Sequence, residues 1–181
     1  MSGAVARRYA RALFALAKEG RLLQPTADQL ERVAAVANDP HLGPVLDNPL
    51  LSAQRRRDIA QTLIRELALS DLLARFLSLL ADHQRLGELD SIADHFRRLL
   101  DDEMGRVRIA IRCAAPLDPR QETDLLAVFS KLTGKDIIPQ VAVDPDLLGG
   151  IVVEAEGKVY DGSVRTQLHR LAKELSGAAS L

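Results

Sequence analysis

The chain has 181 residues, of which 47% are hydrophobic and 27% charged, proportions typical of a folded protein with a core of its own. Its 24 Lys and Arg residues are balanced by 25 Asp and Glu residues, so it lacks the excess of positive charge with which nucleic-acid-binding domains attract phosphates. Aromatic residues make up only 3%, so the core must be built from Leu, Val, Ile and Ala.

The sequence contains no feature of a secreted or membrane-spanning protein. Cys113 is the only cysteine, which excludes an internal disulfide and fits a reducing compartment. No apolar run approaches the roughly 20 residues that a membrane-spanning helix needs. The first residues lack an apolar signal region and a cleavage site, so we predict no signal peptide and no direct membrane insertion.

Residues 4–104 are predicted to form one helix after another, because apolar side chains recur at spacings of three and four residues. The first helix is rich in Ala and Leu and ends near Gly20. The second is expected to begin at Pro25 and Thr26, and Asp39-Pro40 ends it. Residues 40–49 contain three prolines, which leave room for only a short helical piece.

Three more helices complete this part of the chain. Ser52 and Ser70 are placed to cap the fourth and fifth helices, and the sixth runs from about Leu89 to Met104. The dense basic cluster Arg55–Arg57 is interpreted as a solvated face of the fourth helix. Short connections favour antiparallel neighbours, so we predict a mainly α protein that begins with a six-helix antiparallel bundle.

At Gly105 the period of the apolar residues changes from helical to alternating. Val107, Ile109 and Ile111 share one face of a predicted strand over residues 106–113, and arginines occupy the other face. Asp118-Pro119 is a typical helix start, and Gly134 provides the corresponding end.

The last part of the chain predicts two further strand signals and a helix. Pro139 favours an edge position for the strand over residues 137–143, and the next strand signal begins at Ile151 and continues past Glu156-Gly157 to Tyr160. Asp161-Gly162-Ser163 is predicted to open a final helix. This helix carries a narrow apolar seam with the spacing of a coiled-coil face: Val164, Leu168, Leu171 and Leu175. We therefore predict a small α+β domain after the helical bundle.

No catalytic template fits this sequence. It contains neither a phosphate-binding loop nor a dinucleotide-binding glycine motif, and its four histidines are scattered. Cys113 lies in phase with the buried face of its strand, where a thiol is inert, and one cysteine cannot build a structural zinc site. Glu154 and Glu156 are interpreted as part of a solvated outer face. We expect no catalytic residue, no metal and no cofactor, and neither binding nor hydrolysis of ATP by the isolated chain.

The first and fifth helices have more apolar surface than one core face requires. The first helix has two apolar sides. One carries Val5, Tyr9, Ala12, Leu13 and Leu16, and the other carries Ala6, Ala10, Phe14 and Ala17. One interpretation is a helix surrounded on all sides in a compact bundle. The other is a groove between helices that accepts a helix of a partner protein. Periodicity alone leaves both open.

The two ends of the chain resemble the ATP synthase delta subunit family, whose mitochondrial member is the oligomycin-sensitivity-conferring protein. The N-terminal run Ala6-Arg-Arg-Tyr-Ala-Arg-Ala-Leu-Phe is similar to the family's opening helix. The C-terminal signature is a Leu-x-Gly-Gly turn, an apolar strand, an Asp-x-Ser turn and a helix with spaced leucines. Its positions here are Leu147, Gly149, Gly150, Asp161, Ser163, Leu168 and Leu171.

The resemblance implies a connector in the stator of a rotary, proton-translocating ATP synthase. Residues 1–105 would bind N-terminal helices of the alpha subunits of the catalytic head, and residues 106–181 would bind the b subunits of the peripheral stalk. A groove between the first and fifth helices would receive the alpha helix, and from these helices we select five candidate residues: Tyr9, Ala12, Leu16, Leu79 and His83. The C-terminal signature would mark the stalk-binding domain.

The resemblance also implies a place in the cell, a peripheral position on the cytoplasmic face of the bacterial inner membrane. It leaves open whether the stalk holds two identical b chains or b with b-prime. Two functions of other classes remain as alternatives to the connector. A helical regulatory adaptor would not be encoded beside synthase subunits, and a small enzyme would need a polar pocket that the sequence does not indicate.

Overall fold

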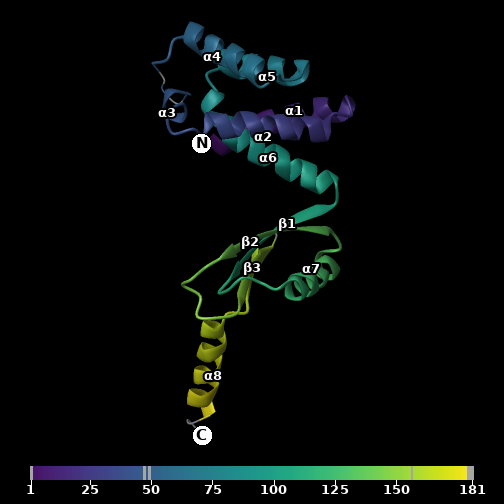
Figure 1. The fold of residues 1–181 in the computed structure, drawn as a ribbon, viewed down its shortest axis with the longest axis vertical. Coiled ribbons are helices and arrows are strands. Elements are labelled where there is room, and N and C mark those ends of the chain that lie inside the picture. The colour runs from purple at the N-terminus through teal and green to yellow at the C-terminus, as the bar shows by residue number, and fades with distance from the viewer. Residues whose placement is uncertain (1, 47, 49, 156, 179–181) are drawn as a thin grey trace. The chain divides into compact units, whose positions relative to one another are not determined.

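The computed structural model describes residues 2–46, 48, 50–155 and 157–178 of the chain (Figure 1). The chain divides into two compact units, Met1–Leu100 and Asp101–Leu181. The first unit is built from helices, and the second contains a four-stranded sheet. The described residues therefore form a mainly helical protein with a small C-terminal sheet, in agreement with the predicted class.

Six α-helices and one 3₁₀ helix follow one another in the first part of the described chain. They are α1 (Ser2–Glu19), α2 (Leu23–Ala37), α3 (Gly43–Leu46), α4 (Ala53–Glu66), α5 (Asp71–Asp82), the 3₁₀ helix η1 (Leu86–Glu88) and α6 (Leu89–Glu103). α2 begins at Leu23, two residues before the predicted start. Pro25 is tolerated there because the first N–H groups of a helix have no helical partner to lose.

The two serines predicted to cap helices behave differently. The Ser52 hydroxyl accepts a hydrogen bond from the Arg55 N–H at 3.3 Å, which is the expected cap of α4. Ser70 stands at the cap position of α5, but its side chain makes no capping bond. Its backbone N–H instead donates to the Gln29 side-chain oxygen at 2.9 Å, which joins the start of α5 to α2.

The core of the first unit surrounds one face of α1. The buried face of this helix consists of small residues and one leucine, namely Ala6, Ala10, Leu13 and Ala17. Their size lets neighbouring helices approach closely, and two ring contacts extend the packing. Phe14 of α1 meets Phe96 of α6 edge to face at 5.5 Å between ring centroids, and Tyr9 of α1 meets Phe76 of α5 in the same manner at 6.3 Å.

The basic cluster Arg55–Arg57 is only partly the solvated helix face that the sequence predicted, because Arg55 and Arg57 are exposed but Arg56 is not. Arg56 is buried, and its guanidinium donates to the backbone carbonyls of Ala81, at 3.2 Å, and of Leu51. Arg57 pairs with Asp82 at 2.7 Å. The last carbonyls of a helix lack helical partners, and Arg56 satisfies one of them at the end of α5. α4 is thereby fixed to the C-terminal end of α5.

The second unit is a sheet with one crossover helix. Its elements are β1 (Arg106–Cys113), α7 (Pro119–Thr133), β2 (Asp136–Val143), β3 (Ile151–Ala155), β4 (Lys158–Asp161) and α8 (Val164–Ala178). The strand order is β2-β1-β3-β4, with β1 and β2 parallel and the other pairs antiparallel. α7 supplies the long connection that a parallel pair requires. β2 lies at an edge of the sheet, as Pro139 predicted.

The two faces of β1 differ as the alternating pattern predicted. Ile109 and Ile111 are fully buried in a cluster with Phe129 of α7, whose ring also meets Tyr160 at 5.3 Å. On the other face, the Arg108 guanidinium binds both carboxylate oxygens of the buried Asp101, at 2.5 and 3.2 Å. Such a bidentate pair fixes both side chains in orientation. It ties the last turn of α6 to β1 within the second unit.

The predicted ends of α7 are confirmed. The Asp118 carboxylate accepts hydrogen bonds from the N–H groups of Arg120 and Gln121, both at 2.8 Å, and the Gln121 side chain accepts from the Asp118 N–H at 3.1 Å. This is a complete capping box. Gly134 ends the helix in the left-handed conformation.

Among the described residues, no helix has the length and apolar character needed to cross a membrane.

Candidate partner-binding surfaces

The two glycines of the C-terminal signature lie against the start of α8. The Val164 N–H donates to the Gly149 carbonyl at 3.0 Å, and a Cβ on Gly149 would come within 2.9 Å of the Val164 side chain. Gly150 has a positive φ of 81°, and a Cβ there would stand 2.3 Å from the Gly162 carbonyl oxygen. Only glycine permits this approach, so the Gly-Gly turn and the Asp-x-Ser turn form one interlocked unit.

A polar network caps α8 at the same place. The Asp161 carboxylate accepts from the Ser163 N–H and from the Thr166 hydroxyl, both at 2.8 Å, and the buried Ser163 hydroxyl accepts from the Thr166 N–H at 3.3 Å. The backbone and hydroxyl bonds of Ser163, the Thr166 hydroxyl and the charge of Arg170 hold the pKa of the Asp161 carboxyl below its ordinary value. Asp161 and Ser163 thus open the final helix, as the sequence predicted.

The remaining signature residues on α8 are exposed. Leu168 and Leu171 have 56% and 55% of their surface accessible, and Val164 is 38% accessible. Their 4-3 spacing forms one apolar stripe, which we call the α8 seam (Val164, Leu168 and Leu171). The side chain of Leu175, predicted as its fourth member, lies outside the described residues. Three exposed aliphatic side chains in a row are the type of surface that a partner helix covers.

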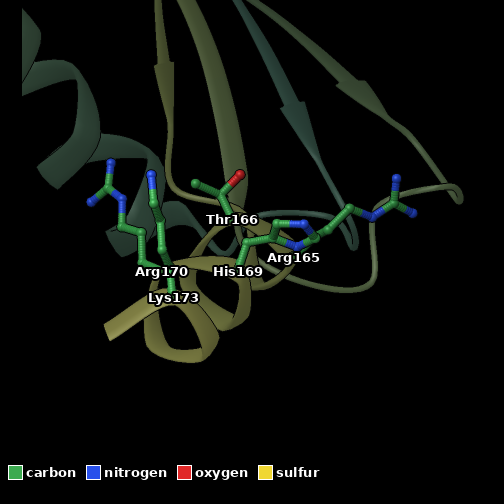
Figure 2. Close-up of a pocket in the computed structure, with 5 residues that line it drawn as sticks. All are labelled: Arg165, Thr166, His169, Arg170 and Lys173. Atoms are coloured by element: carbon green, nitrogen blue, oxygen red, sulfur yellow. The ribbon is translucent and has the colours of Figure 1, made fainter. Parts of the chain in front are cut away.

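The other side of α8 is basic (Figure 2). Arg165, His169, Arg170 and Lys173 line, together with Thr166, a pocket of about 380 Å³. This basic face was not predicted from the sequence, although the sequence contains a signal for it. Three of these residues recur every four positions, and no Asp or Glu occurs between residues 164 and 173.

The candidate residues of the first unit lie on α1 and at the end of α5. Ala12 and His83 are exposed, Leu16 and Leu79 are 53% and 45% accessible, and Tyr9 is half-buried. The contact of Tyr9 with Phe76 brings the two helices together beside these residues. α1 is therefore not surrounded on all sides by its own unit. Leu13, assigned by the sequence to the side of Tyr9, is instead fully buried with the alanines.

A polar pocket of about 340 Å³, whose lining includes Arg112, Asp144, Asp161 and Ser163, is present in the part of the chain that is described. No group of three or more His, Cys, Asp or Glu side chains lies within reach of one metal ion there. Cys113 is buried, and its thiol donates to the Ala142 carbonyl at 3.4 Å. The exposed features of the two units are apolar stripes and a basic helix face, which suit contacts with other proteins.

Comparison with known proteins gives the family. The sequence profile described as ATP synthase delta (OSCP) subunit matches residues 5–175. ATP synthase subunit delta of Anaeromyxobacter dehalogenans is 43% identical over 176 residues, which cover 97% of this chain and 98% of that protein. The corresponding protein of Syntrophus aciditrophicus is 34% identical over 98% of this chain and 99% of its own length.

A solved structure agrees with the sequence comparisons. One chain of the Toxoplasma gondii mitochondrial ATP synthase hexamer, determined by cryo-electron microscopy, superposes with a TM-score of 0.69 at 25% identity. The match covers 94% of this chain and 96% of that chain. The similarity therefore extends over the helices, the sheet and both signature turns, and the chain belongs to the ATP synthase delta (OSCP) subunit family.

Proposed function

We propose that this chain is the stator connector of a rotary ATP synthase. The observation that carries the proposal is its similarity to ATP synthase delta subunits over 97% of its length. A rotor can drive catalysis only if the catalytic head is held still. A protein with two compact units and an exposed apolar surface on each is suited to join the head to a fixed stalk.

The first unit binds an N-terminal helix of an alpha subunit in this proposal. Its helices form the antiparallel bundle, and α1 and α5 provide the groove. Tyr9, Ala12 and Leu16 follow one another at helical spacing on α1, and Leu79 lies on α5 four residues before its C-cap His83. The small Ala12 side chain stands between two larger ones, which leaves room for a knob of the partner helix.

The second unit binds the C-terminal part of the stalk b subunits through the α8 seam. Gly149, Gly150, Asp161 and Ser163 act as positioning residues, because they determine where α8 begins. Leu168 and Leu171 make the contact itself. The connector is itself non-catalytic and works as a peripheral component on the cytoplasmic face of the bacterial inner membrane.

The test is the substitution Ala12→Asp. Ala12 is exposed in the isolated chain, so the variant should fold, with only the loss of up to about 1 kcal/mol that Asp costs relative to Ala inside a helix. In the complex it would bury a carboxylate without a partner, and we expect at least about 100-fold weaker binding to purified alpha subunit. Calorimetric titration measures the affinity.

Ala35→Asp is the matched control, because Ala35 is also an exposed alanine within a helix, α2. This variant should bind alpha subunit normally. Normal binding by Ala12→Asp would show that the alpha helix docks elsewhere.

A further inference from the structure

The basic side of α8 points away from the α8 seam. At about 100° of rotation per residue, the centre of Arg165, His169, Arg170 and Lys173 lies roughly 160° around the helix from the seam. A helix resting on the seam alone would leave this basic face uncovered. Figure 2 shows the basic side chains along the pocket of about 380 Å³ that they line.

We propose that this basic face is a second docking surface, which binds an acidic helical segment of the stalk partner. The inference rests on the stalk connection proposed above and adds the chemistry of a separate contact. Arg165, His169 and Lys173 are spaced by four residues, so their Cα atoms rise by about 6 Å from one to the next. Asp or Glu residues repeated every three or four positions on a partner helix match this spacing.

The geometry favours a protein segment over a membrane surface. A helix that lies on a bilayer buries its apolar side and places basic side chains along the margins of that side. In α8 the apolar and basic residues face opposite directions, so one flat surface cannot contact both. Two helical segments of a stalk can contact both, with α8 between them.

The local charges also distinguish a carboxylate-bearing helix from a nucleic acid. Acidic groups border the N-terminal end of the basic face. Arg165 lines a pocket together with Asp144, Asp146 and Asp161, and the charge of Arg170 acts on Asp161. A continuous row of phosphates would be repelled there, whereas a partner helix can place its carboxylates further along α8.

The experiment measures the affinity of the full chain for purified stalk b subunit at about 50 mM and about 500 mM salt. The double variant Arg165→Gln/Arg170→Gln removes two charges of the basic face and introduces no new repulsion. At low salt it should bind about threefold to tenfold more weakly than the unmodified chain, and at high salt the two affinities should converge.

Three control variants separate this inference from the proposed function. Arg165→Lys/Arg170→Lys keeps the charges and should retain most of the affinity and its salt dependence, and Arg120→Gln removes an exposed charge from α7 and should have no effect. Leu168→Asp disrupts the seam and should weaken binding at both salt concentrations.

If Leu168→Asp abolishes binding while the Gln double variant binds like the unmodified chain at low salt, the seam is the stalk site and the second surface does not exist. If the Gln double variant loses binding only to phosphatidylglycerol vesicles, the basic face contacts lipid and the inference is wrong. If the unmodified chain does not bind b subunit, the stalk connection itself fails.

Discussion

At the scale of single residues, polar side chains determine where several helices begin and how they are held. Asp118 and Ser163 cap α7 and α8, and both follow sequence patterns that predicted them. Arg56 and Asp101 are also essential to the local structure, but no pattern revealed that they are buried. Their partners, the Ala81 carbonyl and Arg108, become available only when separate elements pack together, so residue type and periodicity alone could not identify them.

Asp161 makes the stability of the second unit dependent on pH. Because its pKa is lowered in the folded chain, the charged carboxylate stabilises the fold above the ordinary Asp pKa. This contribution is lost as the pH falls through the lowered folded pKa. Asp161→Asn should therefore melt at a lower temperature than the unmodified chain at pH 7, and the difference should shrink below about pH 4. Thermal unfolding followed by circular dichroism measures the melting temperature of both chains at each pH.

The comparison of the two chains cancels the titration of all other acidic groups. A melting-temperature difference that stays constant from pH 7 to about pH 3 would show that the charge of Asp161 has no part in the cap.

At the scale of elements, the type and order of the helices and strands were predictable, and their exact ends were less so. The change of period at Gly105 identified the first strand, and Pro139 placed β2 at an edge. α2 begins before its proline, and the Ser70 hydroxyl makes no capping bond, although the Ser70 N–H donates to the Gln29 side chain. The start of α2 and the hydrogen bonds of Ser70 both depend on backbone groups and on neighbouring elements in the folded chain, which a sequence pattern does not contain.

Gly150→Ala tests the interlock between the two signature turns. The variant should be destabilised by roughly 2 to 4 kcal/mol, because it combines an unfavourable positive φ with a Cβ that collides with the Gly162 carbonyl. Gly157→Ala is a close control, since Gly157 has a similar φ of 77° but no atom within 4 Å of the added Cβ. The Gly157→Ala variant should lose only about 1 kcal/mol of its free energy of unfolding.

Urea unfolding of the full chain measures the free energy of unfolding of both variants. Equal losses in the two variants would mean that backbone conformation accounts for the whole requirement at Gly150, and that contact with the start of α8 adds nothing.

At the scale of the whole molecule, each unit has a core cluster of its own. Among the described residues, the larger cluster lies between Ala6 and Leu100, and the smaller lies from Val107 onward. The division of work between residues 1–105 and 106–181 stays a prediction. It could be reached from sequence only through the family resemblance, because periodicity locates a boundary but does not identify partners.

A fragment of residues 1–105 tests this division. It contains the complete larger cluster, so it should fold as a helical unit, although removal of Arg108 should loosen the last turn of α6 around Asp101. We expect it to bind alpha subunit with a dissociation constant of about 1 nM, near −12 kcal/mol, and not to bind b subunit. A synthase assembled with the fragment should hydrolyse ATP without pumping protons.

Proton pumping by inverted vesicles tests whether the fragment couples ATP hydrolysis to pumping, with the full-length chain as the positive control. Restoration of coupled pumping by the fragment would show that the second unit is not the joint to the stalk.

The strand order of the second unit has a mechanical consequence. The chain enters the sheet at Arg106, which is paired with Asp136 at one end, and leaves it at Asp161, which is paired with Val152 toward the other end. A pulling force applied between these points acts along the strands and across the hydrogen bonds between them. Many bonds then share the load at once in shear, whereas a hairpin pulled open from one end loses its bonds one at a time. The sheet is thus oriented to resist tension between its first strand and α8.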